Sequence, residues 1–398
     1  MNPSNQSSIS IEYIWIDAIG NLRSKCRTIG TDYLINSNIV DIISCNVNKD
    51  LILTGEDGQL LRESLLWNYD GSSTGQAEGH DSEIIIKPVY ICPNAWKNTK
   101  LSSDRYYLAL CDTYNKNDEL LSNNYYNRVI HNIRGNEKYE FLFSFEQEFF
   151  IMHPNHRNMN IISNIPIGLP LPYQSYANVG YNHQTTQQYY CAIGYENTHV
   201  MGRNIVEKVY HYGISSGLIL SGYNAEVAAG QWEIQVGPSI NIRACHELWI
   251  IRYLLKMIAA EEGLCIEFHP KPLADWNGSG LHTNFSGCEM RNCVDRRGYD
   301  IIQKYCQQLG TNHTETMKSY GEFNELRMTG RYETASFDRF SYDIANRGCS
   351  VRISNSVLNN GGGYIEDRRP ASNADPYRIY SILTNVYQLA IDQLAIDQ

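Results

Sequence analysis

Residues 141–152 read FLFSFEQEFFIM, an aromatic and apolar stretch with Glu146 and Glu148 near its centre. This composition predicts a strand buried in a sheet. Because strand side chains alternate between faces, both carboxylates should point the same way, about 7 Å apart along the strand. Burying two anions side by side is costly unless a cation compensates them. Two explanations fit the stretch equally well: an Arg or Lys partner for each carboxylate, or a pair of divalent cations bound by oxygen ligands.

Length, charge and cysteine content limit the class of protein. With 398 residues the chain can bury a large core, and two domains are the natural expectation. The net charge of -10 argues against a nucleic-acid or membrane partner but leaves room for a local basic pocket. No apolar run approaches the roughly 20 residues that span a bilayer, and residues 1–10 lack signal-peptide features. The 11 cysteines include no C-x-x-C pair, so we expect reduced thiols and a cytoplasmic location.

The order of strand and helix patterns predicts an α+β protein. We expect a disordered tail at residues 1–10, a small sheet-rich domain at residues 11–112 and a larger domain at residues 113–398. The larger domain should contain helices at about 196–212, 241–262 and 289–309. Its last helix should begin at Asp375-Pro376 and turn inward Ile379, Leu383, Val386 and Leu389. The segment 152–190 lacks periodicity, and so long a loop is usually functional or partly mobile.

Two further segments place polar residues on one strand face. Residues 224–227 and 231–236 are separated by Ala-Ala-Gly, which predicts a hairpin. In its second arm Gln231, Glu233 and Gln235 share a face, which suits either the wall of a wet cavity or a solvated surface. His282 lies in another strand-like segment, and a lone strand histidine is usually structural. The glycine-rich residues 276–280 before it instead indicate a backbone that approaches a ligand closely.

Several arginines fall within a short span of this acidic chain, close to a second polar motif. Period two places Tyr364, Glu366 and Arg368 on one face, where they could contact a base, a metal and a carboxylate in turn. A plain surface pair of Glu366 with an arginine is the alternative. Guanidinium groups suit bidentate recognition of carboxylate and phosphate, and further arginines lie upstream at Arg327, Arg331, Arg339, Arg347 and Arg352.

Together these residues indicate a site for hard divalent cations and for anions. Two three-ligand sets, with room left for water and phosphate, suit Mg²⁺ or Mn²⁺ and not a closed Zn²⁺ site. Paired metals with arginines indicate phosphoryl transfer from a nucleotide, and the absence of G-x-x-x-x-G-K-[ST] excludes a P-loop. The candidate ligands are Glu146, Glu148, Glu226, Glu233, His282 and Glu366.

Over nearly its whole length the chain resembles the glutamine synthetase family, in its eukaryotic-type subgroup. The motifs that carry this resemblance are WNYDGSST (67–74), FEQE (145–148), NAEV (224–227), QWEIQVGP (231–238), WNGSGLHTNFS (276–286), TGRYET (329–334), ANR (345–347) and YIEDRRP (364–370). The resemblance implies a small N-terminal β-grasp-like domain and a larger catalytic domain, in which an antiparallel sheet forms a funnel surrounded by helices. It also implies ATP-dependent ligation of ammonia to L-glutamate through γ-glutamyl phosphate, giving L-glutamine, ADP and phosphate.

The resemblance divides the metal ligands into two sets, for at least two Mg²⁺ or Mn²⁺ ions per site. It assigns one ion to Glu148, Glu226 and Glu233. It assigns the other, which bridges to the nucleotide phosphates of ATP, to Glu146, His282 and Glu366.

The resemblance also implies roles for substrate-contacting and catalytic residues. It implies that Asp70, helped by Ser73, deprotonates ammonium, and that Glu333 belongs to a flap that closes over the intermediate. Tyr364 is expected at the nucleotide. Glutamate contacts are expected from Asn277, Gly278, Arg327 and Arg368, and phosphate contacts from Arg347 and Arg352, with Arg347 and Arg368 also taking part in catalysis.

In this family the N-terminal domain of one subunit completes the site of its neighbour. The resemblance therefore implies a homo-oligomer, most simply two stacked pentameric rings with sites between adjacent subunits. The partners expected are L-glutamate, ammonium and ATP, with neither nucleic acid nor membrane.

Some positions depart from the family pattern. The segment 152–190 is longer than is typical, Gly168-Leu-Pro170 stands where many members have Gly-Trp-Pro, and Leu326 replaces a second arginine beside Arg327. Two alternative functions remain open: a ring that has lost catalysis and serves a structural role, and a ligase that amidates glutamate with another amine. Retention of all six metal-ligand positions favours an enzyme over a structural ring, and Asp70 with Ser73 favours ammonium over other amines.

Overall fold

The structure is a computed structural model that describes residues 8–30, 43, 45–51, 55–101, 105–122, 124–154, 165–168, 189–193, 201–274 and 276–396. The chain divides into two compact units. The first comprises residues 1–131, 211–218 and 249–253, and the second comprises residues 132–210, 219–248 and 254–398. Among the described residues, no helix is long and apolar enough to cross a bilayer.

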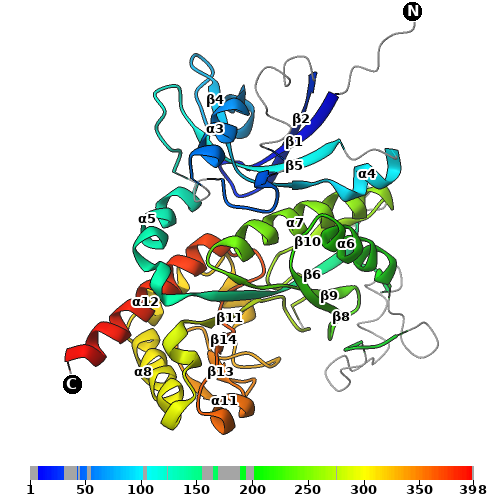
Figure 1. Cartoon of the computed structure of the whole chain (residues 1–398). Helices are drawn as coiled ribbons and strands as arrows, with labels where there is room; N and C mark the ends of the chain where they lie inside the picture. The colour runs from blue at the N-terminus through cyan, green and yellow to red at the C-terminus, as the bar shows by residue number, and fades with distance from the viewer. Residues whose placement is uncertain are drawn as a thin grey trace, which may run out of the picture. The chain divides into compact units, whose positions relative to one another are not determined.

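The first unit is built on a five-stranded sheet in the order β2-β1-β5-β4-β3 (Figure 1). Strands β1 and β5 are parallel, and the other neighbours are antiparallel. Its core includes Tyr13, Trp15 and Ile86 of the sheet and Leu61 of the helix α3. The elements are β1 (Ser8–Ile16), β2 (Leu22–Gly30), α3 (Glu56–Ser64), β3 (Trp67–Asp70), η1 (Gly71–Thr74), β4 (Glu83–Pro93), α4 (Ala95–Leu101) and β5 (Tyr106–Tyr114).

The second unit is built on a larger sheet in the order β12-β13-β14-β11-β6-β9-β8, and β7 and β10 pair with β6 outside this path. Its strands are β6 (Leu142–His153), β7 (Ile165–Pro166), β8 (Leu220–Ala225), β9 (Gln231–Ile240), β10 (Cys265–Glu267), β11 (Leu281–Ser286), β12 (Tyr342–Ile344), β13 (Val351–Ile353) and β14 (Ile365–Asp367).

The remaining elements are helical. They are the α-helices α5 (Tyr126–Asn136), α6 (Arg203–Ser215), α7 (Arg243–Glu261), α8 (Arg297–Thr311), α9 (His313–Met317), α10 (Asn324–Arg327), α11 (Asn355–Asn360) and α12 (Pro376–Ile396), with 3-10 turns η2 (Glu137–Tyr139), η4 (Cys288–Arg291) and η5 (Val294–Arg296).

An aromatic layer covers one face of the β6–β11 pair. Phe143 of β6 lies 4.7 Å from the ring of Tyr380 and 4.9 Å from the ring of Phe285 on β11. Tyr387 lies about two turns after Tyr380 on the same face of α12. Its ring contacts the rings of Phe141 and Phe285. All five rings are almost fully buried. Because strand side chains alternate, this packing of α12 turns the even-numbered residues of β6 toward the opposite face.

Several sequence predictions are confirmed. The chain is of the α+β class, and residues 141–152 contain the central strand β6. The hairpin predicted around residues 228–230 is the antiparallel pair β8–β9. The last helix begins at Pro376, and the Asp375 carboxylate caps it by accepting hydrogen bonds from the backbone N–H groups of Tyr377 and Arg378, at 2.8 and 3.2 Å.

Other predictions about secondary structure were wrong. β1 begins at Ser8, inside the predicted tail, because Ser8 pairs in the ladder with Gly30. The helix predicted at 289–309 starts only at Arg297, because Asp295 and Arg296 have left-handed φ angles of 48° and 62°. Leu389 is 56% exposed, since the inward stripe of α12 runs through Tyr387 and Ala390 instead.

The predicted boundary after Asp112 falls within β5, and the first unit continues to residue 131. All 11 cysteines are free thiols, as expected, and Cys26 and Cys191 are among the exposed ones. Most of the segment 152–190, with His156, Leu169 and Pro170, lies outside the described residues.

Candidate metal centre and adjoining pocket

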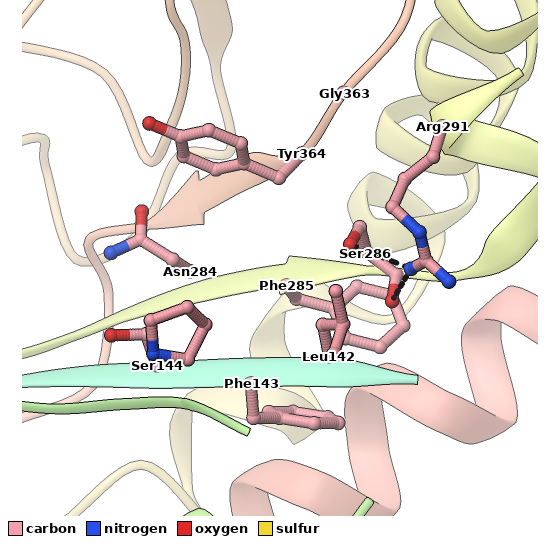
Figure 2. Close-up of a pocket in the computed structure, with 10 residues that line it drawn as sticks. Leu142, Phe143, Ser144, Asn284, Phe285, Ser286, Arg291, Gly363 and Tyr364 are labelled. Carbon is pink, nitrogen blue, oxygen red and sulfur yellow. Dashed lines mark hydrogen bonds between the residues drawn. The ribbon is translucent and has the colours of Figure 1, made fainter. Parts of the chain in front are cut away.

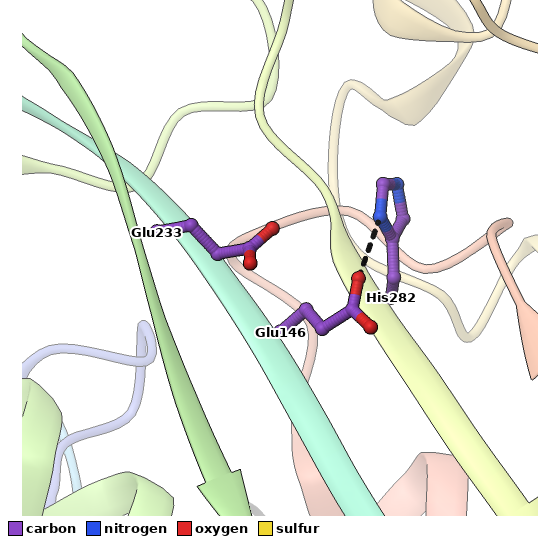
Figure 3. A group of neighbouring side chains, drawn as sticks. All are labelled: Glu146, Glu233 and His282. Carbon is purple, nitrogen blue, oxygen red and sulfur yellow. Dashed lines mark ion pairs between the residues drawn. The ribbon is translucent and has the colours of Figure 1, made fainter. Parts of the chain in front are cut away.

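The sheet of the second unit brings the candidate metal ligands together. Glu146 and Glu148 lie on β6, with His282 of β11 opposite Glu146 and Glu233 of β9 opposite Glu148. Glu226 follows β8 directly, where its N–H bonds to the carbonyl oxygen of Gln231 at 2.9 Å. One hairpin and two strands from distant parts of the sequence thus converge on one place, and Figure 3 shows the side chains of Glu146, Glu233 and His282 turned toward one another.

Two groups of ligand atoms are compact enough to hold a cation each. The first is Glu148, Glu226 and Glu233, the set expected from the family resemblance. The second is Glu146, Glu233 and His282. Within each group the ligand atoms lie within 4.8 Å of one another. Glu233 belongs to both groups and therefore lies between the two positions.

Glu366 differs from its expected role in one respect. Its Oε1 lies 3.8 Å from the Nδ1 of His282, so it borders the cluster. Both of its oxygens are bound by arginine, one by Arg368 at 2.6 Å and the other by Arg352 at 3.1 Å. Glu233, and not Glu366, completes the compact group with Glu146 and His282. The pair of Glu366 with Arg368 is buried, so it is not a plain surface pair.

Neutral donors fix the orientation of the other carboxylates. Glu148 accepts a hydrogen bond from the backbone N–H of Gly280 at 2.8 Å, and Glu146 accepts one from the amide of Asn284 at 2.8 Å. Glu226 and Glu233 accept comparable bonds from Asn224 and Gln235. Among the described residues, no Arg or Lys forms an ion pair with these four glutamates. The first explanation of the sequence pattern, one basic partner for each carboxylate, is therefore wrong.

Burial shifts the pKa of each residue in the two compact groups. Loss of solvation, reinforced by the nearby Glu226, raises the pKa of Glu148 to about 8, and burial raises the pKa of Glu226 to about 7. The pKa values of Glu146 and Glu233 are raised for the same reason. Burial lowers the pKa of His282 well below its usual value, so its imidazole is neutral. A cluster that holds protons near neutral pH and contains a neutral imidazole is one that releases protons when it binds a cation.

The donor set fits a hard divalent cation. Carboxylate oxygens with one imidazole suit Mg²⁺ or Mn²⁺, and the absence of thiolate ligands from both groups argues against a closed Zn²⁺ site. A cation would also remove the cost of placing several buried carboxylates side by side without basic partners.

Arg327 lies beneath the cluster and is itself buried. Its Nη2 donates to the carbonyl oxygens of Arg368, Arg369 and Pro370 at 3.0, 2.8 and 3.1 Å. Burial lowers the pKa of Arg327 to about 10, which still leaves the guanidinium charged at neutral pH. Arg327 therefore fixes the backbone of residues 368–370.

The expected glutamate-binding loop packs tightly against Arg327. A Cβ at Gly278 would lie 2.2 Å from the carbonyl oxygen of Pro270 and 2.8 Å from Cγ of Arg327, so no other residue fits there. The Gly278 carbonyl accepts a hydrogen bond from Gln231 at 2.9 Å. Asn277 precedes Gly278 and is half-buried.

Glu333 lies in a constrained loop next to the arginines. Tyr332 and Glu333 both have left-handed φ angles, 54° and 63°, which cost non-glycine residues energy. The Glu333 carboxylate pairs with Arg347 at 3.4 Å, and its carbonyl accepts a hydrogen bond from Nη2 of Arg368 at 3.4 Å. The structure thus gathers Glu333, Arg347 and Arg368. Arg331 and Arg339 are exposed.

The two guanidinium groups that bind Glu366 each keep an unused donor. The Nε atoms of Arg352 and Arg368 are buried and have no hydrogen-bond partner among the described residues. Buried donors of a charged group are almost always paired, so these two indicate an anionic ligand beside Glu366.

A pocket of about 350 Å³ adjoins the cluster (Figure 2). Its walls are largely apolar, with the ring of Tyr364 on one side and Ser144 and Asn284 on another. Ser144 and Asn284 each lie two residues from a cluster ligand on the same strand, about 7 Å away. The other lining residues are Leu142, Phe143, Pro238, Phe285, Ser286, Arg291 and Gly363.

The loop that carries Asp70 belongs to the first unit. Asp70 is exposed and caps the 3-10 turn η1, accepting hydrogen bonds from the N–H of Ser72 at 3.0 Å, its hydroxyl at 2.7 Å and the Ser73 hydroxyl at 3.2 Å. The Ser72 bonds lower the pKa of Asp70, so it is ionised at neutral pH. Ser72 was missed by the sequence analysis, although it lies in the same motif as Ser73.

Two further residues were missed in the second unit. Asn284 orients Glu146, and its place two residues after His282 could have revealed it. Tyr190 follows the long segment, and its ring centroid lies 5.9 Å from the Arg347 guanidinium. The backbone N–H of Cys191 donates a hydrogen bond to the carbonyl oxygen of Ala225, next to Glu226, at 2.9 Å. No periodicity surrounds Tyr190, so little in the sequence around it could have revealed this position.

Comparisons with known proteins agree with this geometry. Residues 124–298 match the family model "Glutamine synthetase, catalytic domain". The chain is 39% identical to the chloroplastic glutamine synthetase of Brassica napus over 380 residues, which cover 94% of this chain and 77% of that protein. It is 39% identical to a putative glutamine synthetase of Acanthamoeba polyphaga mimivirus, covering 96% and 94% of the two chains. It is 38% identical to the glutamine synthetase of Colletotrichum gloeosporioides, covering 97% and 94%.

The raised pKa of Glu148 predicts that the metal-free protein becomes less stable to unfolding as the pH rises. The protonated form stabilises the fold fully below about pH 4.5, and this stabilisation is lost as the pH rises to about 8. Glu148→Gln keeps the shape of the side chain without its charge. In the presence of a chelator, the Tm of Glu148→Gln minus the Tm of the wild type should therefore rise as the pH increases through this window. The rise should correspond to roughly a few kcal/mol of unfolding free energy. Scanning calorimetry measures this, with the exposed Glu315→Gln as control. A Tm difference independent of pH would contradict the prediction.

Proposed function

The chain belongs to the glutamine synthetase family of glutamate–ammonia ligases, and we propose that it makes L-glutamine from L-glutamate, ammonium and ATP through γ-glutamyl phosphate. The observation that carries this proposal is the cluster of buried glutamates with one neutral histidine and without basic partners, bordered by arginines with unused donors. A structural ring has no use for such a cluster, because the cluster costs stability.

The cluster would hold two divalent cations. Glu148, Glu226 and Glu233 would hold one, and Glu146 and His282 would hold the other with Glu233 or Glu366. When bound, such cations neutralise charge on the transferring phosphoryl group. Release of Glu366 from Arg352 or Arg368 would make its oxygens available for the second position.

The arginines act on the anions of both substrates. A carboxylate is a poor electrophile, and its conversion to an acyl phosphate concentrates negative charge. Arg368 can donate through its free Nε to the γ-carboxylate of glutamate, and Arg352 can donate in the same way to a phosphate. Arg347, which pairs with Glu333, would bind phosphate from the side of the loop that carries Glu333. Arg327, Asn277 and Gly278 would position the rest of the glutamate.

The pocket next to the cluster suits the base of ATP. Its apolar walls and the half-exposed ring of Tyr364 would stack on a purine, while Ser144 and Asn284 offer polar contacts at its edge. Ser144 and Asn284 at the pocket lie two residues from Glu146 and His282 on the same strands. The phosphates of ATP bound in the pocket would therefore extend toward Glu146 and Arg352.

Asp70 would act on ammonium. Because hydrogen bonds from Ser72 and Ser73 keep it ionised, Asp70 attracts the ammonium cation and then accepts its proton, which makes ammonia nucleophilic. Glu333 would close over the acyl phosphate and exclude water, which would otherwise hydrolyse it.

The family resemblance also supports a proposal about location and assembly. We propose a cytoplasmic enzyme, in line with the cytosolic isozymes of Pinus sylvestris and Daucus carota, which the chain matches at 37% and 38% identity. We also propose two stacked pentameric rings in which Asp70 of one subunit serves the cluster of the next.

The direct test is product formation. Glutamine should form from glutamate and ammonium only when ATP and Mg²⁺ or Mn²⁺ are present, and phosphate should be released in equal amount. Polyamines and other amines tested in place of ammonium identify the alternative ligase. Absence of any γ-glutamyl product with either metal, from an assembled preparation, would favour the structural ring.

Subunit mixing tests whether Asp70 acts on a neighbouring subunit. Asp70→Asn and Glu366→Ala subunits should each be nearly inactive alone. When they are dissociated and reassembled together, some sites combine an intact Asp70 with an intact cluster, and activity should return. A mixture of Glu226→Ala with Glu366→Ala is the control, because both changes lie in one cluster and no intact site can form. Equal behaviour of the two mixtures, or a fully active monomer in light scattering, would contradict the proposal.

Loss of Glu333 should separate ATP consumption from amide formation. Glu333→Ala should still release phosphate in the presence of glutamate, but the ratio of phosphate to glutamine should rise above one as the intermediate leaks to water. Glu366→Ala should instead reduce both products together. The exposed Glu325→Ala serves as control. If Glu333 only pairs with Arg347, both rates will fall and the ratio will stay at one.

A further inference from the structure

Lys271 lies between two loops of the proposed active site and contacts both. Its ammonium group donates a hydrogen bond to the carbonyl oxygen of Trp276, at the start of the loop that carries Asn277 and Gly278. The same nitrogen lies 4.1 Å from the ring centroid of Tyr332, the residue before Glu333. An ammonium so close to an aromatic face makes a cation–π contact.

The first loop is held firmly on the side of Lys271. The backbone N–H of Lys271 donates to Nδ1 of His269 at 3.0 Å, and the Pro270 carbonyl accepts a hydrogen bond from Ser279 at 2.9 Å. The close approach of Pro270 to Gly278 completes this contact. The position of Lys271 is therefore fixed to the glutamate-binding loop.

The second loop needs contacts to keep its conformation. Tyr332 and Glu333 have left-handed φ angles, so the loop gives up a more favourable backbone conformation in this arrangement. Inside the loop, Gly330 bonds to Ala335 and Thr334 bonds to Arg331, both at 3.2 Å. The ring of Tyr332 on the Lys271 ammonium adds a contact from outside the loop.

We propose that Lys271 is a positioning residue that couples the glutamate-binding loop to the loop carrying Glu333. Glutamate bound to the backbone of Asn277 and Gly278 would fix the neighbouring Trp276 carbonyl. The Lys271 ammonium, which donates to this carbonyl, would then be fixed as well. Its contact with the Tyr332 ring would hold Glu333 over the site. Closure then occurs on glutamate binding, before the acyl phosphate can meet water. Coupling of this kind is reciprocal, so a closed loop also favours glutamate. The inference rests on the proposed function.

Paired substitutions test the coupling. Lys271→Met keeps the aliphatic chain without the charge and should raise the KM for glutamate roughly two- to thirtyfold, the range expected for one lost cation–π contact. It should also raise the ratio of phosphate to glutamine above one, with little change in the KM for ATP. Lys271→Arg should restore both values, because a guanidinium can make the same two contacts. Tyr332→Leu should reproduce Lys271→Met, and Tyr332→Phe should not, because it keeps the ring.

The double variant and a distant lysine complete the comparison. If Lys271 and Tyr332 act through each other, Lys271→Met combined with Tyr332→Leu should be no worse than either single change. Lys256 lies 5.6 Å from the Phe268 ring, so Lys256→Met removes a similar contact elsewhere in the second unit and should leave the product ratio at one. A ratio of one in Lys271→Met, or additive effects in the double variant, would overturn the proposal.

A measurement without catalysis keeps this outcome distinct from failure of the proposed function. Hydrogen exchange of residues 329–337 in the intact protein should slow when glutamate is added, and this slowing should be lost in Lys271→Met but kept in Lys271→Arg. Unchanged protection in Lys271→Met would contradict the coupling, even if the wild type proves inactive as a ligase.

Discussion

Electrostatic repulsion among buried carboxylates is the constraint on which the rest of this structure depends. Glu146, Glu148, Glu226 and Glu233 meet beside one face of a sheet, and none forms an ion pair with an Arg or Lys among the described residues. Loss of solvation raises the pKa of each of them. A fold that tolerates such a cluster must recover the cost elsewhere, either in its packing or by binding cations.

The opposite face of the same strands supplies the packing. Phe141, Phe143 and Phe285 form a continuous aromatic layer with Tyr380 and Tyr387 of α12, which fixes the strands that carry the ligands. Neutral donors such as Gly280 and Asn284 then orient the carboxylates without cancelling their charge. The site thus keeps its negative potential for cations, while arginines at its border supply positive charge for the substrates.

Local periodicity predicted much of the site. Alternation along one strand placed Glu146 beside Glu148 and Tyr364 beside Glu366, and the hairpin followed from Ala-Ala-Gly. The pairing of His282 with Glu146, and of Glu233 with Glu148, depends on the register between distant strands, which no single segment encodes. The resemblance to a family supplied that information. It could not show that Arg352 and Arg368 occupy Glu366, or that Asp295 and Arg296 break a helix, because these follow from individual contacts and backbone angles.

The most direct test of this account is the number of cations that the cluster binds. Equilibrium dialysis of the metal-free protein against Mn²⁺ should give two bound ions per chain in the wild type. It should give one in Glu226→Gln, because Glu226 belongs to only one of the two ligand groups. Wild-type protein that binds no Mn²⁺ at the cluster, or a Glu226→Gln variant that still binds two ions with wild-type affinity, would contradict the account.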